Sequence, residues 1–413
     1  MTRRTAYVVV ASVAVVPRLV VLLSERGDIL ASFTEKSDLF AKTFVDHGTF
    51  GFIPGEPSAW TQPLYSFFLI PIYWIVGREW WAVGLAQIAV AAATAIVVYE
   101  IGRRFLSHRA GLVAAVVATL SPYLVWHDVH VNRELLDQLL ATVVVLLTLV
   151  VGERRGGLAG PALLGVALGL AILGNSRLVL LPLVISGYLI WRRKGWQTAA
   201  VVLAACAVAL LPWLVRNDAN VGCFTLNTDS RAVWKANNLA TYDTLDRGGW
   251  IDDVPNLPGA PPWPELAADL TLSGRPTTVD ECAQMRLYRR EVVDFWQEHP
   301  SEKARLMGQA ARMLWDPRSI RTEGRAEAGG FVDDARTWAQ PLHAIPLYLL
   351  GVIGLFVMPR RIAVLFVALL AYNTLAALVF AGATRYRVPW DFVLALAAGT
   401  AVVWLLDRWR AAR

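Results

Sequence analysis

The chain has 413 residues, of which 56% are hydrophobic and 17% are charged, and its mean hydropathy is +0.45. An ordinary soluble domain is far less apolar, so this composition excludes a soluble enzyme and indicates a chain whose solvent is lipid. The net charge is +6, but the basic residues stand in short clusters at the ends of apolar runs, where they set membrane topology. We therefore expect no nucleic-acid partner.

Apolar runs near bilayer length recur along the chain and predict an all-α polytopic membrane protein with about ten transmembrane helices. The first run contains Pro17 and Arg18 and lacks a small-residue cleavage site, so we expect it to remain as a helix. The predicted spans lie near residues 5–24, 81–102, 109–126, 134–151, 158–174, 177–191, 197–215, 341–358, 361–381 and 388–406.

The basic clusters predict the orientation of these spans, because Lys and Arg accumulate in cytoplasmic loops. With ten spans every cluster falls on one side, so both termini are expected in the cytoplasm. The clusters are Arg3 and Arg4, Arg103 and Arg104 with His108 and Arg109, Arg154 and Arg155, 192–194, Arg360 and Arg361, and 408–413.

The apolar segment 63–77 is too short to cross about 30 Å of hydrocarbon, and as a span it would invert every later loop. We interpret it as an interfacial or re-entrant helix, with Tyr65, Tyr73 and Trp74 in the headgroup region.

This topology divides the chain into three parts: an N-terminal transmembrane module, 1–215, with its first outer loop at 25–80; a large outer loop, 216–340; and C-terminal transmembrane helices, 341–413. Helical patterns at 281–298 and 302–315 indicate that the large loop is folded, and a groove is expected between the two outer loops. Cys223 and Cys282 could pair if that loop faces an oxidising compartment.

The first outer loop holds a distinctive run of residues. An amphipathic helix begins at 37–41 (SDLFA) and closes at His47-Gly48, followed by 50–52 (FGF) and 57–65 (PSAWTQPLY). Further short motifs follow in order along the chain. They are Gly102-Arg103-Arg104, Ser121-Pro122, Glu134 with Asp137, Pro212-Trp213 before Arg216-Asn217, Asn237-Asn238, His299-Pro300, and 385–389 (RYRVP).

In this order and on this topology, the motifs resemble the GT-C class of polyprenyl-phosphate-dependent glycosyltransferases, which includes the dolichyl-phosphate-mannose protein mannosyltransferases and the lipid A aminoarabinose transferases. Two residues depart from the protein mannosyltransferases: Leu39 follows Asp38 where they carry an acid, and Phe40 stands where a Tyr is usual. The acceptor therefore stays open among lipid, glycan and protein.

The resemblance implies a hexosyl- or pentosyltransferase of the bacterial cytoplasmic membrane. It would move a sugar from a polyprenyl-phosphate donor to its acceptor at the outer face, with inversion. The leaving phosphate departs as a stable anion, so it needs cations rather than a general acid. Asp38 is then the general base.

The alternatives are that Asp38 caps its helix, that the chain is a ligase with a lipid diphosphate donor, or that it is a lipid or glycan transporter. A transporter should show two related halves, and the sequence has none.

The remaining site predictions lie on the same outer side. Arg385 and Arg387 at the mouth of the last span are expected to hold the donor phosphate through paired hydrogen bonds, or else to be interfacial anchors. Arg177 and Arg216 are further phosphate candidates. Glu134 and Asp137 share one helix face near a polar cavity and are the other catalytic candidates. In the first outer loop, we expect Asp46, His47 and Glu56 to be surface residues without a role in the site.

His127, Asp128 and His130 could bind a divalent metal ion together with Glu134. The sequence favours a solvated loop here instead, so a metal is a candidate cofactor and not a required one.

Overall fold

The computed structural model describes residues 2–30, 36–153, 157–318 and 331–413, with side chains in the last range from Trp338 onward. Within these ranges the chain is all-α, and the β-type pairing consists of one isolated bridge between Ile53 and Glu56. Seven helices of the described part are long and apolar enough to cross a membrane. They are α1 (Arg3–Ser24), α4 (Trp80–Phe105), α7 (Glu134–Glu153), α10 (Trp196–Val221), α16 (Phe331–Val357), α17 (Arg360–Val379) and α19 (Asp391–Ala411). The prediction of an all-α polytopic membrane protein is confirmed.

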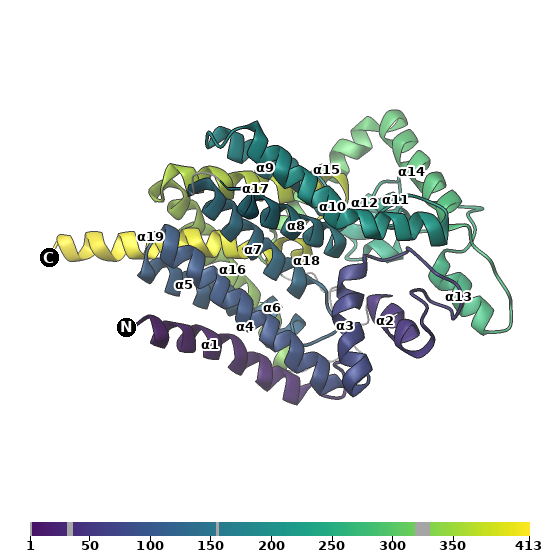
Figure 1. Cartoon of the computed structure of the whole chain (residues 1–413), viewed down its shortest axis with the longest axis horizontal. Helices are drawn as coiled ribbons and strands as arrows, with labels where there is room; N and C mark the ends of the chain where they lie inside the picture. Colours follow the sequence, from purple (N-terminus) through teal and green to yellow (C-terminus); the bar gives the residue numbers. More distant parts are fainter. Residues whose placement is uncertain (1, 31–35, 154–156, 319–330) are drawn as a thin grey trace.

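Three of the ten predicted spans form shorter helices that lie alongside the long ones (Figure 1). They are α5 (His108–Thr119), α8 (Ala159–Gly174) and α9 (Leu181–Trp191). Pro122 ends the first of them early, because proline has no N–H to donate and disfavours a helical residue before it; α6 (Pro122–His127) starts anew there. Asn175 adopts an extended conformation after α8 and caps the short 3-10 helix η1 (Ser176–Leu178).

The helices approach one another closely at small residues, as is common in membrane bundles. A Cβ atom at Gly165 of α8 would lie 2.3 Å from the carbonyl oxygen of Val202 in α10. One turn later, a Cβ atom at Gly169 would lie 2.6 Å from that of Ala209. This close contact fixes α10, which carries the chain out to the large loop.

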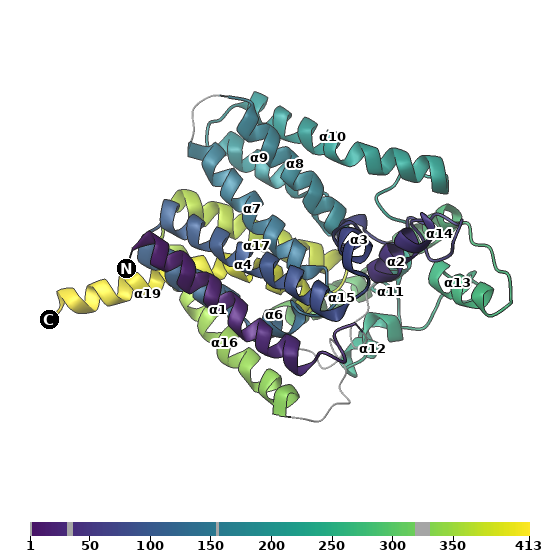
Figure 2. The same ribbon diagram turned by 60° about the horizontal axis from the view of Figure 1, so that its bottom comes forward.

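The short segment after the first outer loop forms α3 (Pro63–Val76), which runs across the direction of the long helices (Figures 1 and 2). Its aromatic residues do not all face outward as predicted. Tyr65 and Tyr73 are buried, because their hydroxyl groups find polar partners in the protein: Tyr65 donates to Oε1 of Gln87 at 2.6 Å and Tyr73 donates to Asp38. Trp74 and Ile75 are 78% and 83% exposed and can contact lipid.

The large loop lies at the end of the bundle opposite the two termini (Figure 1). Its helices are α11 (Arg231–Lys235), α12 (Thr241–Asp246), α13 (Pro264–Leu272), α14 (Glu281–Glu298) and α15 (Pro300–Trp315). The prediction of helix 281–298 and of a break at His299-Pro300 is confirmed. α10 continues past its predicted end at 215 and stops at Gly222, whose left-handed φ of 88° terminates the helix.

Two sets of contacts fix the large loop. A disulfide between Cys223 and Cys282 joins the end of α10 to the start of α14. Lys303 of α15 donates to the carbonyl oxygens of Leu378 and Val379 at the C-terminal end of α17, at 2.8 and 3.3 Å. Burial lowers the pKa of Lys303 to about 8. The loop is therefore attached to the spans at the same end as the polar residues described next.

Candidate functional site

Asp38 lies in the first turn of α2 (Lys36–His47), the amphipathic helix that the sequence predicted, and is 1% exposed. Its Oδ1 accepts from the hydroxyl of Tyr73 and from Nε of Arg78 at 3.1 Å, and its Oδ2 accepts from Nη2 of Arg78 at 2.7 Å. These partners lie at the end of α3 and just beyond it. The carboxylate therefore connects α2 to α3, which is a different role from the helix cap considered above.

Arg78 and Tyr73 are the partners that the sequence analysis missed. Arg78 directly follows the α3 segment and resembles an ordinary basic residue at a helix end. The available signal was Asp38 itself, because a carboxylate that becomes buried on folding needs a cation nearby. The side chain of Arg78 is 35% exposed, whereas that of Asp38 is 2% exposed, so this pair lies at the edge of the protein interior.

A second group of predicted residues surrounds a cavity of about 10 Å³, which is room for about one water molecule. It lies where α7, η1 and α17 meet α18 (Thr384–Arg387) and the 3-10 helix η4 (Val388–Trp390). The cavity brings together four of the predicted site residues: Glu134, Asp137, Arg177 and Arg385.

Glu134 and Arg385 form the ion pair of this cavity. Nε of Arg385 donates to Oε1 of Glu134 at 2.7 Å, and Nη2 lies 2.6 Å from the same oxygen. Glu134 is 2% exposed, and within the described residues its buried Oε2 has no hydrogen-bond partner. Arg385 compensates the charge of the carboxylate, while Oε2 stays available to a ligand.

Asp137 and Arg177 occupy another wall of the cavity. Asp137 accepts from Nδ2 of Asn175 at 2.9 Å. The guanidinium of Arg177 stacks over the ring of Tyr386 at 4.0 Å. Its buried Nε and Nη2 atoms find no hydrogen-bond partner in the part of the chain that the structure describes. A guanidinium with unused donors beside carboxylates is suited to bind an anionic oxygen.

Arg387 and Arg216 lie outside this cavity. Nη1 of Arg387 donates to the carbonyl oxygens of Leu314 and Asp316, at 3.0 and 2.8 Å, and so holds the end of α15. Arg216 donates to the carbonyl oxygens of Ser58 and Phe50, at 2.8 and 3.0 Å, and connects α10 to the first outer loop. The structure thus gives these two predicted phosphate ligands partners in the backbone.

The predicted solvated loop at 127–130 is wrong, because His127, Asp128 and His130 are all fully buried. Oδ2 of Asp128 accepts from Nε and Nη2 of Arg18 at 2.9 and 2.7 Å, which neutralises both charges. Nε2 of His130 lies 3.0 Å from Oε2 of Glu25. The described residues contain no group of three or more His, Cys, Asp or Glu able to hold a metal ion. Asp46, His47 and Glu56 are exposed, as predicted.

Two larger grooves open on the side of the large loop. One, of about 450 Å³, lies between the first outer loop and the large loop, where a groove was expected, and includes Glu56, Ser58 and Asp280 in its walls. The other, of about 540 Å³, is lined by residues of η1, the start of the large loop and α14. Ser176 and Val179 line this groove, whereas Asn175, Arg177 and Leu178 line the cavity, so η1 separates the two spaces.

α3 connects the Asp38 pair to the cavity. Oγ of Ser66 donates to the backbone carbonyl of Ser37, next to Asp38, at 2.9 Å. Leu64 lies two residues earlier in α3. A Cβ atom at Gly174 would lie 3.1 Å from the side chain of Leu64 and 3.2 Å from Oδ1 of Asp137. A displacement of α3 would therefore change the surroundings of both Asp38 and Asp137.

Comparisons with known proteins find a partial family match and solved structures with a similar fold. Residues 57–215 match the family described as dolichyl-phosphate-mannose-protein mannosyltransferase. The archaeal oligosaccharyltransferase AglB from Archaeoglobus fulgidus, in complex with an inhibitory peptide and a dolichol-phosphate, has a similar structure: 14% identity and a TM-score of 0.56, covering 99% of this chain and 51% of that one. A structure of the Archaeoglobus fulgidus oligosaccharyltransferase in complex with Zn and sulfate gives 13% identity and a TM-score of 0.58, covering 98% of this chain and 49% of that one.

ArnT from Cupriavidus metallidurans bound to undecaprenyl phosphate shares 14% identity, with a TM-score of 0.48 over 97% of this chain and 78% of that one. No curated protein sequence matches the chain significantly. The chain spans about half the length of the oligosaccharyltransferase structures, at 51% and 49%.

The chain therefore shares a GT-C-type membrane fold with these oligosaccharyltransferase structures, and its residues 57–215 are similar to the dolichyl-phosphate-mannose-protein mannosyltransferase family.

Proposed function

We propose that the chain transfers a single sugar from a polyprenyl-monophosphate donor to an acceptor at the outer face of the bacterial cytoplasmic membrane, with inversion. The observation that carries this proposal is the cavity in which Arg177 has unused donors beside the Arg385–Glu134 pair. A departing phosphate needs cations of this kind, and the guanidinium fork matches its oxygens.

The proposed reaction has one displacement step. An acceptor hydroxyl oxygen forms a bond to the anomeric carbon, and the bond from that carbon to the phosphate oxygen breaks with its electron pair on the phosphate. The hydroxyl proton passes to Asp38. Because Arg78 and the hydroxyl of Tyr73 engage this carboxylate, we expect the acceptor hydroxyl to replace that of Tyr73 at Oδ1.

Arg385 and Arg177 would hold the donor phosphate. The cavity has about 10 Å³ of free space, so phosphate binding requires Arg385 to exchange Glu134 for the ligand. The proposed step assigns the stabilisation of the departing phosphate to these two arginine side chains.

The direct test is turnover of two donors that differ in the leaving group. Purified protein in proteoliposomes would be given undecaprenyl-monophosphate or undecaprenyl-diphosphate sugars, each carrying a labelled hexose or pentose, with membranes from cells lacking the gene as the source of acceptor. We expect release of undecaprenyl phosphate from the monophosphate donor. Turnover of the diphosphate donor alone would establish a ligase, and movement of intact lipid without cleavage would establish a transporter.

We also propose that the end of the bundle with the large loop faces outward and that both termini are cytoplasmic. The disulfide between Cys223 and Cys282 supports this orientation, because such bonds persist outside the reducing cytosol. Arg154 and Arg155, part of the cytoplasmic prediction, lie outside the described residues.

Cysteine labelling of intact cells tests the orientation. The background is low, because Cys206 is buried and the other two cysteines are bonded to each other. We expect Glu56→Cys and Gly259→Cys, both exposed, to react with a membrane-impermeant thiol reagent, and Arg193→Cys to react only after the cells are permeabilised. The reverse pattern would place the site in the cytoplasm and contradict the proposal.

A further inference from the structure

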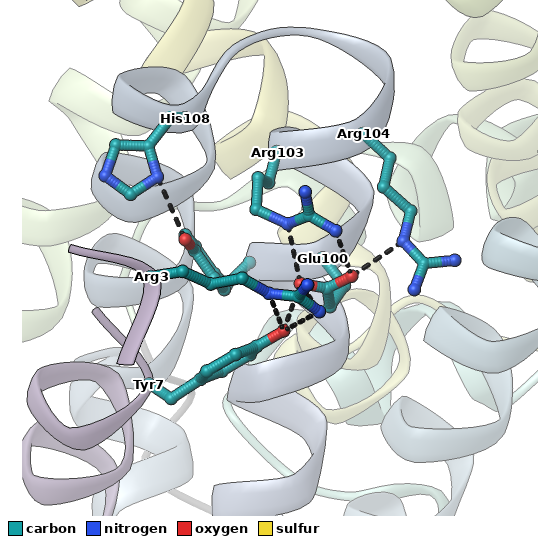
Figure 3. A network of polar contacts seen from close by, with 7 residues as sticks. Arg3, Tyr7, Glu100, Arg103, Arg104 and His108 are labelled. Carbon is teal, nitrogen blue, oxygen red and sulfur yellow. Dashed lines mark hydrogen bonds and ion pairs between the residues drawn. The ribbon is translucent and has the colours of Figure 1, made fainter. Parts of the chain in front are cut away.

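At the end of the bundle that carries both termini, arginine side chains surround one carboxylate (Figure 3). Glu100 lies near the C-terminal end of α4 and is 7% exposed. Arg103 donates through Nε to Oε1 and through Nη2 to Oε2, both at 2.8 Å. Arg104 donates through Nε to Oε2 at 2.6 Å. Glu100 thus fixes two guanidinium groups on one side of α4.

A third arginine joins this cluster from another helix. Arg3, at the start of α1, donates through Nε and Nη2 to the hydroxyl of Tyr7, at 3.0 and 2.8 Å. That hydroxyl donates to Oε1 of Glu100 at 2.5 Å, and Nη2 of Arg3 lies 3.8 Å from the same oxygen (Figure 3). Two helices distant in sequence therefore contribute to one preorganised group.

The cluster has more positive charge than its carboxylate can neutralise. Three guanidinium groups face one carboxylate, which leaves an excess of two positive charges. The bonds to Tyr7 and Glu100 use Nε and Nη2 of Arg3 and of Arg103 and Nε of Arg104, whereas a guanidinium has five N–H donors. The side chains of Arg3 and Arg104 are 59% and 44% exposed. The surface therefore offers donors and charge to an anion that arrives from outside the protein.

The position of the cluster indicates which anion. α1 and α4 both have membrane-spanning length and apolarity, and the arginines lie at their ends, which is the level of lipid headgroups. Farther along α1, Val8, Val16 and Val20 are 65%, 56% and 63% exposed. An amphiphile with an anionic head and apolar chains matches both features, whereas a free anion would use only the arginines.

We propose that the Glu100 cluster (Arg3, Tyr7, Glu100, Arg103 and Arg104) binds the phosphate headgroup of an anionic phospholipid whose acyl chains lie along the exposed apolar face of α1. This lipid site is independent of the proposed sugar transfer, because it lies at the opposite end of the bundle from the cavity.

Native mass spectrometry of the full chain, released from nanodiscs of phosphatidylcholine and phosphatidylglycerol, tests the site. We expect the wild type to retain phosphatidylglycerol preferentially. The variant Arg3→Gln/Arg104→Gln should lose that preference by about tenfold, because each arginine near the membrane surface contributes to binding. The matched control is Arg408→Gln/Arg410→Gln, which removes the same charge from α19 at the same end of the bundle (Figure 1) and should retain the preference.

Equal losses in the two double variants would show general charge attraction and overturn the proposal. Displacement of the lipid by inorganic phosphate at millimolar concentration would show a free-anion site and would overturn the choice of a lipid. If Arg3→Gln/Arg104→Gln does not fold, the single variant Arg104→Gln replaces it, since that side chain is 44% exposed. A preference unchanged in the single variant would then contradict the proposal.

Discussion

Asp38→Asn is expected to lower turnover by a factor of about a hundred to ten thousand while the protein folds and inserts normally. The amide keeps the size of the carboxylate, and its oxygen still accepts from Arg78, so the connection between α2 and α3 survives. The variant can no longer take the proton of the acceptor hydroxyl. Turnover of the monophosphate donor is the measurement, with thermal unfolding recorded on the same samples.

The matched control for Asp38→Asn is Asp46→Asn, an exposed position on the same helix, which should leave turnover unchanged. Binding of undecaprenyl phosphate should also survive in Asp38→Asn, because the phosphate is held elsewhere. Near wild-type turnover would make Asp38 a structural link between α2 and α3, and Glu134 or Asp137 would then be tested as the base.

Arg385→Ala is expected to have two separable effects. It removes the cation that pairs with buried Glu134, and loss of one partner of a buried pair costs about 3–5 kcal/mol of stability. It should also weaken binding of undecaprenyl phosphate by roughly tenfold to a hundredfold, which corresponds to one charge-assisted hydrogen bond of about 1.5–3 kcal/mol. Arg385→Lys should recover only part of the binding, since lysine lacks the bidentate fork.

The double variant Arg385→Ala/Glu134→Gln distinguishes these effects. Neutralising Glu134 removes the unpaired buried charge, so stability should return while lipid binding stays weak. Both quantities can be measured in nanodiscs, with Arg360→Ala as a control that removes an exposed positive charge elsewhere. If the double variant recovers lipid binding as well, Arg385 serves only to neutralise Glu134 and is not a phosphate ligand.

Local patterns predicted much of this architecture. Hydropathy located the apolar helices, and the run after Ser37 located α2, because both signals depend on residues close in sequence. Helix length was harder to predict, since the ends of α5 and α10 depend on single residues, Pro122 and Gly222. The cavity was partly predictable: Glu134 and Asp137 share one helix face, but Arg177 and Arg385 reach them from distant segments.

The partners of buried charges were the least predictable feature. Arg78 reaches Asp38 across 40 residues, and Arg18 reaches Asp128 across 110. Separations of this length are too long for any local sequence pattern to reveal the pairs. Because desolvation makes an unpaired buried charge costly, a buried acid needs a cation, but only the fold selects which arginine supplies it. For the same reason, the positions of Arg387 and Arg216 were predictable while their backbone partners were not.

The pairing of Arg18 with Asp128 has a consequence for the order of events during synthesis. The first helix leaves the ribosome before Asp128 exists, and at about 5–20 residues per second the missing 110 residues take roughly 5–20 s. An unpaired arginine costs about 2.5–3.5 kcal/mol at the centre of a membrane-spanning helix and less toward its end, where Arg18 lies in α1 (Arg3–Ser24). We therefore expect the nascent first helix to remain at the insertion machinery until Asp128 has been synthesised, and to enter the bilayer only after it can pair with that residue.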